Sequence, residues 1–574
     1  MKRSYKIYLK TWALAGVLLG LNACQLTDLD INTNPNQPAT GSLKLLLPNA
    51  ELAAINSATQ IVNTASGFAG QITSSDDYDL NNNSFNGTWD NFYLSMQNVE
   101  QMLRATEDGL NPAYRGIALT LKAFAVGNMV DTFGDIPYFD AWKGNVAGTD
   151  RAVKFDKDAV IYEDLIKLCD QAVVEFGKNQ AVAVSGDFIN NGSAASWIRL
   201  AKTVKLRLLM NSRKGRTTGN ADLKAAFAAG GFISSSAQDF IYQYSTQISP
   251  VDNRHPWFRN SYLADNGFTY INHQLMGEMI LNKDPRLPFY FYRQTARVLN
   301  QADPTDRGTT PYGGTYMPLR ASFLAEYKKV FYNDAKELTT DDIAYIAGIF
   351  GRDRGDNTGA AADTPLRTAP GAYPAGGLYS GREIAARALT GGTGSGNGIW
   401  PIITSWNVKF YQVEAILDGT GVTGDARALF EAAMREQIAL VVRTAQRVDS
   451  KSVAPTDASI TDYVNNWLKL YDAAPTDQGK LNVVAKQIWF STWGQGQEIW
   501  NLMRRTGYPL QGQFKQFSTT IQAPILKPKR QYALRLPYPS QEGSLNSNAA
   551  PYLQNVIFDR DPLFWDKTKV TWSF

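Results

Sequence analysis

The side chains that most often carry catalysis are sparse in this chain of 574 residues. The two histidines, His255 and His273, stand eighteen residues apart in a stretch with loop composition, and two isolated imidazoles do not make a metal site. The sequence motifs of zinc proteases, thiol redox proteins, serine hydrolases and P-loop proteins do not occur. The sequence therefore predicts no metal and no cofactor.

The carboxylates that most suggest chemistry are Asp353 and Asp356 in the stretch GRDRGDNTG. Glycoside hydrolysis needs two carboxyl groups about 5–10 Å apart in space, which a sequence cannot establish. A Gly-rich loop ordered by Arg–Asp ion pairs explains the same residues, and a ligand contact or a cation site is a further alternative. We expect a protein that is not an enzyme.

The clearest chemical signal is Cys24, which ends an apolar segment. Four basic side chains and no acidic one precede residues 11–21, TWALAGVLLGL. Eleven residues are too few to span a bilayer, and the pattern is typical of a signal peptide. The sequence Leu21-Asn22-Ala23-Cys24 resembles a bacterial lipobox, in which the cysteine thiol receives lipid. An ordinary signal peptide with an incidental cysteine and an uncleaved anchor are the alternatives.

This interpretation divides the chain into a signal peptide at 1–23, a lipid-anchored tether at 24–41 and a single binding domain at 42–574. The acidic residues that follow Cys24 resemble the surface-export signal of Bacteroidetes lipoproteins, so we expect a protein in the outer membrane, facing the cell exterior. Cleavage removes four positive charges and leaves 53 basic against 53 acidic residues. A neutral protein has no field that gathers polyanions, so nucleic-acid binding is excluded.

Aromatic residues are abundant, with 13 Trp, 27 Tyr and 27 Phe. Aromatic faces stack on sugar rings, but most large aromatics fill protein cores. The remaining cysteine, Cys169, lies on one apolar helical face with Tyr162, Leu165, Ile166 and Val173. We expect it to be buried and unreactive.

Helices must position these side chains, because apolar residues recur at helical spacing in most of the chain. One helix should begin at Asn111-Pro112 and end before Gly134. Long polar or Gly-rich stretches between the helices are candidates for functional loops. The predicted helices are 42–66, 89–103, 112–132, 157–176, 195–211, 423–447 and 482–505, and the interrupting stretches are 73–88, 250–273, 301–320, 351–382 and 389–398. Successive helices with short connections favour a mainly α, solenoid-like scaffold.

Several phrases, taken together, resemble the SusD/RagB family of nutrient-binding outer-membrane lipoproteins. Their order and spacing agree with the family across nearly the whole mature chain. The phrases are DINTNPNQPAT (30–40), MVDTFGDIPYFDAW (129–142), WIRLAKTVKLRLLM (197–210), DPRLPFY (284–290), AYPAGG (372–377), QEIWNLMRRTGYP (497–509) and RLPYPSQEGSLNSN (535–548). The same residues also have architectural explanations: Gly134 ends a helix, and Arg504 and Arg505 can pair with buried acids or carbonyl groups.

The resemblance implies a tetratricopeptide-like scaffold of helix pairs that carries an irregular, loop-rich, ligand-binding part. It further implies a lid over a SusC-like TonB-dependent transporter, to which a captured nutrient, most often a glycan, is delivered. Ligand contacts in this family come from loop aromatics, and Tyr78, Trp89, Trp257 and Tyr316 are the candidates here. For Trp89, which resembles a binding tryptophan, burial at the start of a helix is the alternative.

The sequence thus predicts a lipid-anchored protein that captures a nutrient. Two rival functions stay open at this point: a lipid-anchored glycan hydrolase, and a structural transporter lid without a ligand of its own. The hydrolase predicts turnover that depends on carboxylates, whereas the lid predicts transporter association without ligand affinity.

Overall fold

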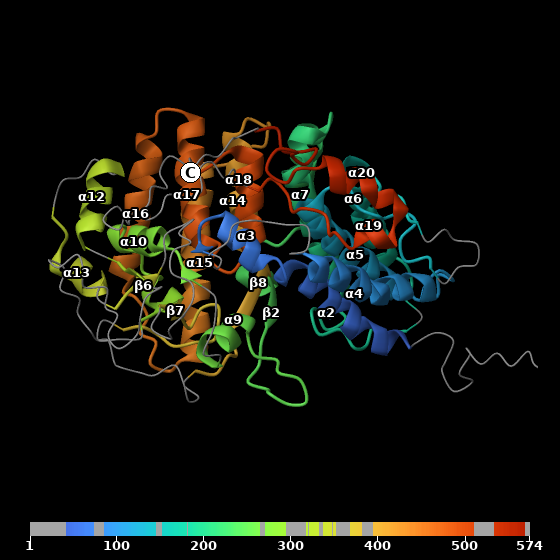
Figure 1. The fold of residues 1–574 in the computed structure, drawn as a ribbon, viewed down its shortest axis with the longest axis horizontal. Helices are drawn as coiled ribbons and strands as arrows, with labels where there is room; N and C mark the ends of the chain where they lie inside the picture. The colour runs from blue at the N-terminus through green and yellow to red at the C-terminus, as the bar shows by residue number, and fades with distance from the viewer. Residues whose placement is uncertain are drawn as a thin grey trace, which may run out of the picture.

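The computed structural model describes the fold over most of the chain (Figure 1). The described residues are 42–73, 85–144, 152–180, 182–263, 270–293, 317–319, 321–331, 337–346, 348–351, 368–381, 394–509 and 533–568. Among them, no helix combines the length and apolar character needed to cross a membrane. The fold is mainly helical, as predicted.

The first half of the chain forms a group of consecutive helices that pack on one another, blue to green in Figure 1. They are α2 (Leu43–Thr59), α3 (Val62–Phe68), α4 (Asn86–Ala105), α5 (Pro112–Phe133), α6 (Asp158–Phe176), α7 (Ala194–Ser212) and α8 (Gly219–Ala229). Helix α5 lies at the centre, in contact with α2, α4, α6 and α7. Helices α2 to α7 confirm the predicted helices, except that 42–66 is two helices, and α8 was not predicted.

Helix α5 illustrates how local sequence sets the boundaries of an element. Asn111 precedes the helix and Pro112 occupies its first turn, where the missing N–H costs nothing. Gly134 follows the last turn with φ +83°, a left-handed conformation that favours glycine. Nearly every side chain of α5 is buried, because helices cover it on several sides. The predicted start and end are therefore confirmed.

The second half contributes another set of packed helices and several short ones. The long helices are α14 (Ser405–Leu417), α15 (Ala426–Val448), α16 (Asp457–Ala473), α17 (Asp477–Ser491) and α18 (Gly496–Thr506). The others are α10 (His273–Leu281), which contacts α12 (Ala321–Phe331) and α13 (Thr340–Ile346). The single predicted helix 482–505 is two helices, because the chain turns at Gly494 with φ +91°. Helices α10, α12, α13, α14 and α16 were not predicted.

The strands in the described part of the chain are short and pair in twos. The antiparallel pairs are β1 (Ile72–Thr73) with β3 (Tyr270–Ile271), β2 (Phe240–Gln243) with β8 (Ile399–Ile403), β4 (Phe291–Tyr292) with β7 (Ala369–Pro370), and β5 (Met317–Pro318) with β6 (Phe350–Gly351). The remaining short helices are α9 (Pro256–Phe258), α11 (Leu287–Tyr290), α19 (Glu542–Leu545) and α20 (Ala550–Asn555). Each strand pair joins segments distant in sequence and fixes the irregular segments to the helices.

A continuous apolar core extends from Leu46 in α2 to Trp565 near the end of the described chain. The segment 533–568 returns to the first helical group, where α19 and α20 lie beside α4 to α6 (Figure 1). Cys169 is buried in α6, and burial raises the pKa of its thiol far above the usual range. The predicted burial of this thiol is confirmed.

Glu51 of α2 and Asp187 form a buried carboxyl pair that makes the stability of the protein depend on pH. Burial, followed by the neighbouring Asp187 carboxylate, raises the pKa of Glu51 to about 10. Glu51 therefore stays protonated, and its hydroxyl group donates a hydrogen bond to the Asp187 carboxylate. Asp187 also accepts hydrogen bonds from three backbone N–H groups and from the indole of Trp197. The unfolded chain loses the Glu51 proton above pH 4.5, so stability falls as pH rises from there to about 10.

We therefore expect Glu51→Gln, which keeps a donor toward Asp187 but cannot ionise, to remove this part of the pH dependence. At pH 7 the gain should be roughly 3 kcal/mol, since each pH unit above the unfolded pKa contributes about 1.4 kcal/mol. Urea unfolding of both proteins at pH 5, 7 and 9 measures it. Parallel pH profiles for the two proteins would contradict the assignment.

Candidate functional site

The two tryptophans proposed as ligand contacts lie inside the protein. Trp89 is 2% exposed at the start of α4 and Trp257 is 1% exposed in α9. The indole N–H of Trp89 donates to Glu542 Oε1 at 3.0 Å, and that of Trp257 donates to Asn63 Oδ1 at 2.5 Å. For Trp89, burial at the start of a helix was the alternative interpretation of the sequence, and the structure agrees with that alternative. Neither indole presents a face on which a ligand could stack in this conformation.

The other predicted site residues lie outside the described part of the chain. These are the lipidation candidate Cys24, the ligand-contact candidates Tyr78 and Tyr316, and the loop carboxylates Asp353 and Asp356. Of the four aromatic candidates, Trp89 and Trp257 therefore lie in the described part of the chain, and Tyr78 and Tyr316 do not. Their roles stay predictions.

Both histidines are buried, and each accepts a hydrogen bond from a backbone N–H. His255 stacks on Trp400 at 5.0 Å with the rings 8° apart, and its Nδ1 accepts the backbone N–H of Trp257. His273 Nε2 accepts the backbone N–H of Gly351 at 3.0 Å. Within the described ranges, no three His, Cys, Asp or Glu side chains gather to hold a metal ion. Both imidazoles therefore serve the fold.

The environment of His255 predicts acid sensitivity. Burial, assisted by the nearby Arg259, lowers the pKa of His255 from 6.5 to about 3. Below pH 6.5, His255 becomes protonated in the unfolded chain but stays neutral in the folded protein. The free energy of unfolding therefore decreases as pH falls from 6.5 toward 3. At pH 5 the expected loss from this group is about 2 kcal/mol.

His255→Asn should weaken this acid dependence, because an asparagine still accepts the Trp257 N–H but does not titrate. The variant should be less stable at pH 7, where it loses the ring stacked on Trp400, and its stability should fall less between pH 7 and pH 5. Chemical denaturation at both values tests the difference. An unchanged difference between pH 7 and pH 5 would contradict a neutral His255.

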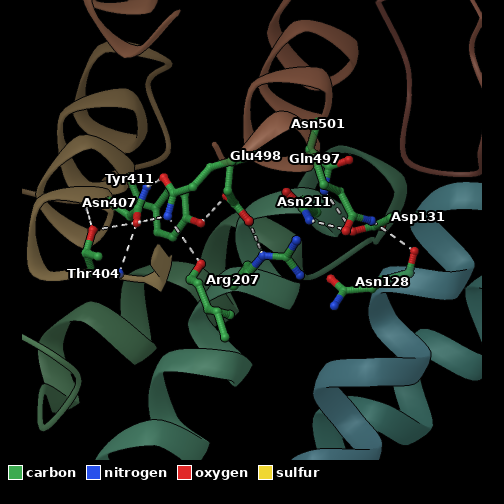
Figure 2. Close-up of polar contacts among 12 residues, drawn as sticks. Asn128, Asp131, Arg207, Asn211, Thr404, Asn407, Tyr411, Gln497, Glu498 and Asn501 are labelled. Atoms are coloured by element: carbon green, nitrogen blue, oxygen red, sulfur yellow. Dashed lines mark hydrogen bonds and ion pairs between the residues drawn. The ribbon is translucent and has the colours of Figure 1, made fainter. Parts of the chain in front are cut away.

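Residues of the phrases 129–142, 197–210 and 497–509, together with residues of α14, form a buried polar network between the two helical groups (Figure 2). Arg207 of α7 donates to Glu498 of α18, whose other oxygen accepts from Tyr411 of α14. Asp131 of α5 accepts from Asn501 at 2.8 Å. We call these contacts the seam network, because they join elements that are hundreds of residues apart in sequence.

Two further arginines of α18 extend the seam network. Arg504 donates to the backbone oxygens of Asp131 and Leu534, both at 2.8 Å. Arg505 donates hydrogen bonds to both carboxylate oxygens of Glu414 in α14, at 2.8 Å and 2.7 Å. The expectation that these arginines pair with buried carbonyls and acids is confirmed. Their role is architectural.

A second buried network underlies the phrase DPRLPFY. Arg286 is fully buried and makes a bidentate ion pair with Asp284, at 2.8 Å and 2.6 Å. Its remaining N–H groups donate to Gln437, Ser491 and Tyr463. These contacts fix the turn between α10 and α11 to α15, α16 and α17.

A cavity of about 550 Å³ lies above this turn, within the size range of small-ligand sites. We call it the turn cavity. Its walls come from the end of α10, the DPRL turn, α13, residues 379–381 and the start of α16. The lining includes Lys283, Phe289, Asp341, Asp342, Tyr345 and Tyr379. The DPRL phrase and the candidate functional loop 351–382 contribute to this lining, whereas the residues of α13 and of 453–459 were not predicted, because the cavity is assembled from four separate segments.

Arg293 holds two of these segments in place. Its guanidinium donates to the carbonyl oxygen of Ala344 at 3.0 Å and to the carbonyl oxygen of Gly381, and its Nε donates to Ser380 Oγ at 3.1 Å. It also lies over the ring of Tyr345, 5.4 Å from the ring centre. Arg293 therefore fixes the segments that carry Tyr345 and Tyr379 relative to each other.

The walls of the cavity combine apolar surface with a few polar groups. The half-buried rings of Tyr345 and Tyr379 and three prolines supply apolar surface, while Thr456 and Ser459 at the start of α16 supply hydroxyl groups. Lys283 is paired with Asp342 at 2.7 Å and also donates to Thr339. This combination of apolar walls and a few polar groups is the usual chemistry of a binding pocket, and it does not provide a nucleophile with a base.

Two protein-family models match this chain. Residues 35–346 match the SusD-like family described as "Starch-binding associating with outer membrane", and residues 395–569 match the family described as "Susd and RagB outer membrane lipoprotein". No curated protein matches the chain.

Solved structures have the same fold. A SusD homologue from Bacteroides fragilis is similar with a TM-score of 0.64 at 17% identity, covering 92% of this chain and 100% of that chain. A chitin-binding SusD homologue from Flavobacterium johnsoniae is similar with a TM-score of 0.58 at 18% identity, covering 92% and 99%. The chain belongs to the SusD/RagB family of non-catalytic, nutrient-binding outer-membrane lipoproteins.

Proposed function

We propose that this lipoprotein captures a glycan at the cell surface and delivers it to a SusC-like TonB-dependent transporter. The observation that carries the proposal is the pair of family matches, which together extend over both helical groups. The described structure adds a preformed cavity with two tyrosines. Lipid on Cys24 would hold the protein in the outer membrane, and one domain over 42–574 would face outward.

The choice of a glycan rests on aromatic chemistry and on one named relative. Aromatic rings with adjacent hydroxyl or carboxylate groups suit a sugar, whose apolar face stacks while its hydroxyls form hydrogen bonds. A structural neighbour is described as chitin-binding, so chitin oligosaccharides are the first ligands to test. Tyr78 and Tyr316 stay as proposed contacts, whereas Trp89 and Trp257 support the fold.

Binding of the mature lipoprotein in detergent to a panel of polysaccharides and peptides, with analysis of products, tests the proposal. Binding of a glycan without degradation is the expected result. Degradation by the pure protein would favour the hydrolase, against the family assignment. A protein that binds nothing alone but co-purifies with its transporter would be the structural lid.

The proposed partner is tested separately. The lipoprotein is expressed together with a SusC-like transporter from the same organism and is purified through a tag on the lipoprotein. Co-elution in a fixed ratio is expected. Recovery of the lipoprotein without the transporter, under conditions that keep both folded, would overturn the delivery step and leave only surface capture.

A further inference from the structure

We propose that the seam network contains a binding site for one internal water molecule, which bridges Asn128 of α5, Gln497 of α18 and Arg207 of α7. The inference goes beyond the proposed function, because it concerns how the two helical groups are joined and not how a nutrient is captured. Three observations carry it: a small cavity, two buried amide oxygens and the donors of a buried guanidinium.

A cavity of about 20 Å³ lies inside the seam network. Its walls come from α2, α3, α5, α7, β8 and α18, so it lies where the two helical groups meet. The lining residues are buried, except for Ala58, which is half-buried. A water molecule needs roughly 10–15 Å³ of such volume, so this cavity has room for one.

Two amide oxygens of the lining, Asn128 Oδ1 and Gln497 Oε1, receive no hydrogen bond within the described part of the chain. Asn128 is 1% exposed and Gln497 is 5% exposed, so the surrounding solvent does not reach them. A buried acceptor without a donor destabilises the fold, and such groups are the usual partners of internal water.

The nitrogen atoms of the two amides fix which way each amide points. Gln497 Nε2 donates to the backbone oxygen of Asn128 at 2.9 Å, and Asn128 Nδ2 donates to Ser57 Oγ at 3.5 Å. The Ser57 hydroxyl already donates to the Ala54 carbonyl oxygen at 2.6 Å. Turning either amide over would therefore place two acceptors against each other. Both oxygens need a donor from elsewhere.

Arg207 supplies donors to the same cavity. A guanidinium carries five N–H donors, and the Nε–H of Arg207 goes to Glu498. Figure 2 shows the guanidinium extending from α7 toward α5, the helix that carries Asn128. Glu498 also lines the cavity, and its other oxygen accepts from Tyr411. The terminal nitrogens of Arg207 are therefore the donors that a small ligand would meet.

These groups define the chemistry of the ligand. It must donate two hydrogen bonds to the amide oxygens, accept one from Arg207 and fill the space of a single heavy atom. Water meets all three conditions. The positive charge of Arg207 disfavours a metal cation, and the two amide oxygens disfavour an anion.

The first experiment is a crystal structure of the mature lipoprotein at a resolution that shows ordered waters. One density peak is expected in the cavity, about 2.7–3.0 Å from Asn128 Oδ1 and from Gln497 Oε1 and in hydrogen-bond contact with Arg207. Contacts of about 2.0–2.5 Å to both oxygens would identify a metal cation and overturn the assignment. A cavity without density would overturn it as well.

A double-mutant cycle with Asn128→Leu and Gln497→Leu tests the bridge in solution. Each substitution removes one of the two oxygens, so each should lower the folding equilibrium constant of the mature lipoprotein by about tenfold or more. Loss of the first oxygen already weakens the shared water, so the double variant should lose clearly less than the product of the two single losses. Urea unfolding of all four proteins measures the coupling.

Asp472→Asn is the matched control, because Asp472 is about half exposed and pairs with Arg427. Combined with Asn128→Leu, it should show no coupling, since the two residues share no partner. Independent losses for the two leucine substitutions would overturn the bridge. If either leucine variant does not fold, the density in the wild-type crystal decides alone.

Discussion

Replacing Trp89 by alanine should lower the free energy of unfolding by about 3–5 kcal/mol, the usual cost of removing a large buried aromatic side chain. Its ring lies 5.1 Å from Tyr93 and 5.2 Å from Phe133, and it also contacts Phe155 and Tyr538. The substitution would also remove the indole N–H from Glu542, a carboxyl group whose pKa burial already raises. Urea or guanidinium unfolding measures the loss.

Trp89→Phe is the matched control, since it keeps most of the ring but not the hydrogen bond, and it should be less costly than the alanine variant. Helix α4 would connect less firmly to the C-terminal segment, because Trp89 and Glu542 are one of its links to that segment. An alanine variant with wild-type stability and reduced ligand affinity would return Trp89 to the list of ligand contacts.

The second large effect is expected at Glu414, where two buried arginines meet. Glu414 is 0% exposed and accepts from both Arg505 and Arg213. Burial raises its pKa, but the attraction of these two arginines outweighs the burial and lowers the pKa below the usual value. Glu414→Gln would leave buried guanidinium charges without this carboxylate, which should cost about 3–5 kcal/mol.

Asp472→Asn provides the comparison that isolates burial. Asp472 makes the same bidentate contact with Arg427, at 2.8 Å and 2.9 Å, but both side chains are about half exposed. An exposed pair contributes only about 0.2–1 kcal/mol. Urea unfolding should therefore separate the two variants by several kcal/mol. Equal small losses would mean that water reaches the seam network.

The lowered pKa of Glu414 also fixes the direction of a pH effect. Its contribution is present above the unfolded pKa of about 4.5 and is lost as pH falls toward the lower, folded value. The stability difference between wild type and Glu414→Gln should thus shrink below pH 4.5. A difference that grows on acidification would contradict a charged Glu414 in the folded protein.

Local signals in the sequence determined a good part of this protein. Helix boundaries such as Asn111-Pro112 and Gly134 depend on neighbouring residues only, so they were predicted correctly. The buried face of α6, including Cys169, followed from helical spacing. The ordered set of short phrases identified the family, because it samples nearly the whole chain. The polar pattern also indicated that Arg504 and Arg505 have structural partners.

Tertiary structure alone decided which aromatics are available to a ligand. An apolar ring at a helix start or in a loop is compatible with either burial or exposure, and the choice depends on what packs over it. Trp89 is covered by residues more than four hundred positions away, including Tyr538 and Glu542. No window of sequence contains that information.

The turn cavity has the same origin. Lys283, Tyr345, Tyr379 and Ser459 belong to four segments that approach one another only in the folded protein, and their types are unremarkable in each segment taken alone. Helix α14, which was not predicted, is buried on nearly all sides, so it lacks the one-sided apolar pattern that reveals a helix. Short-range spacing thus fixed the scaffold, whereas contacts across long sequence separations formed the candidate site.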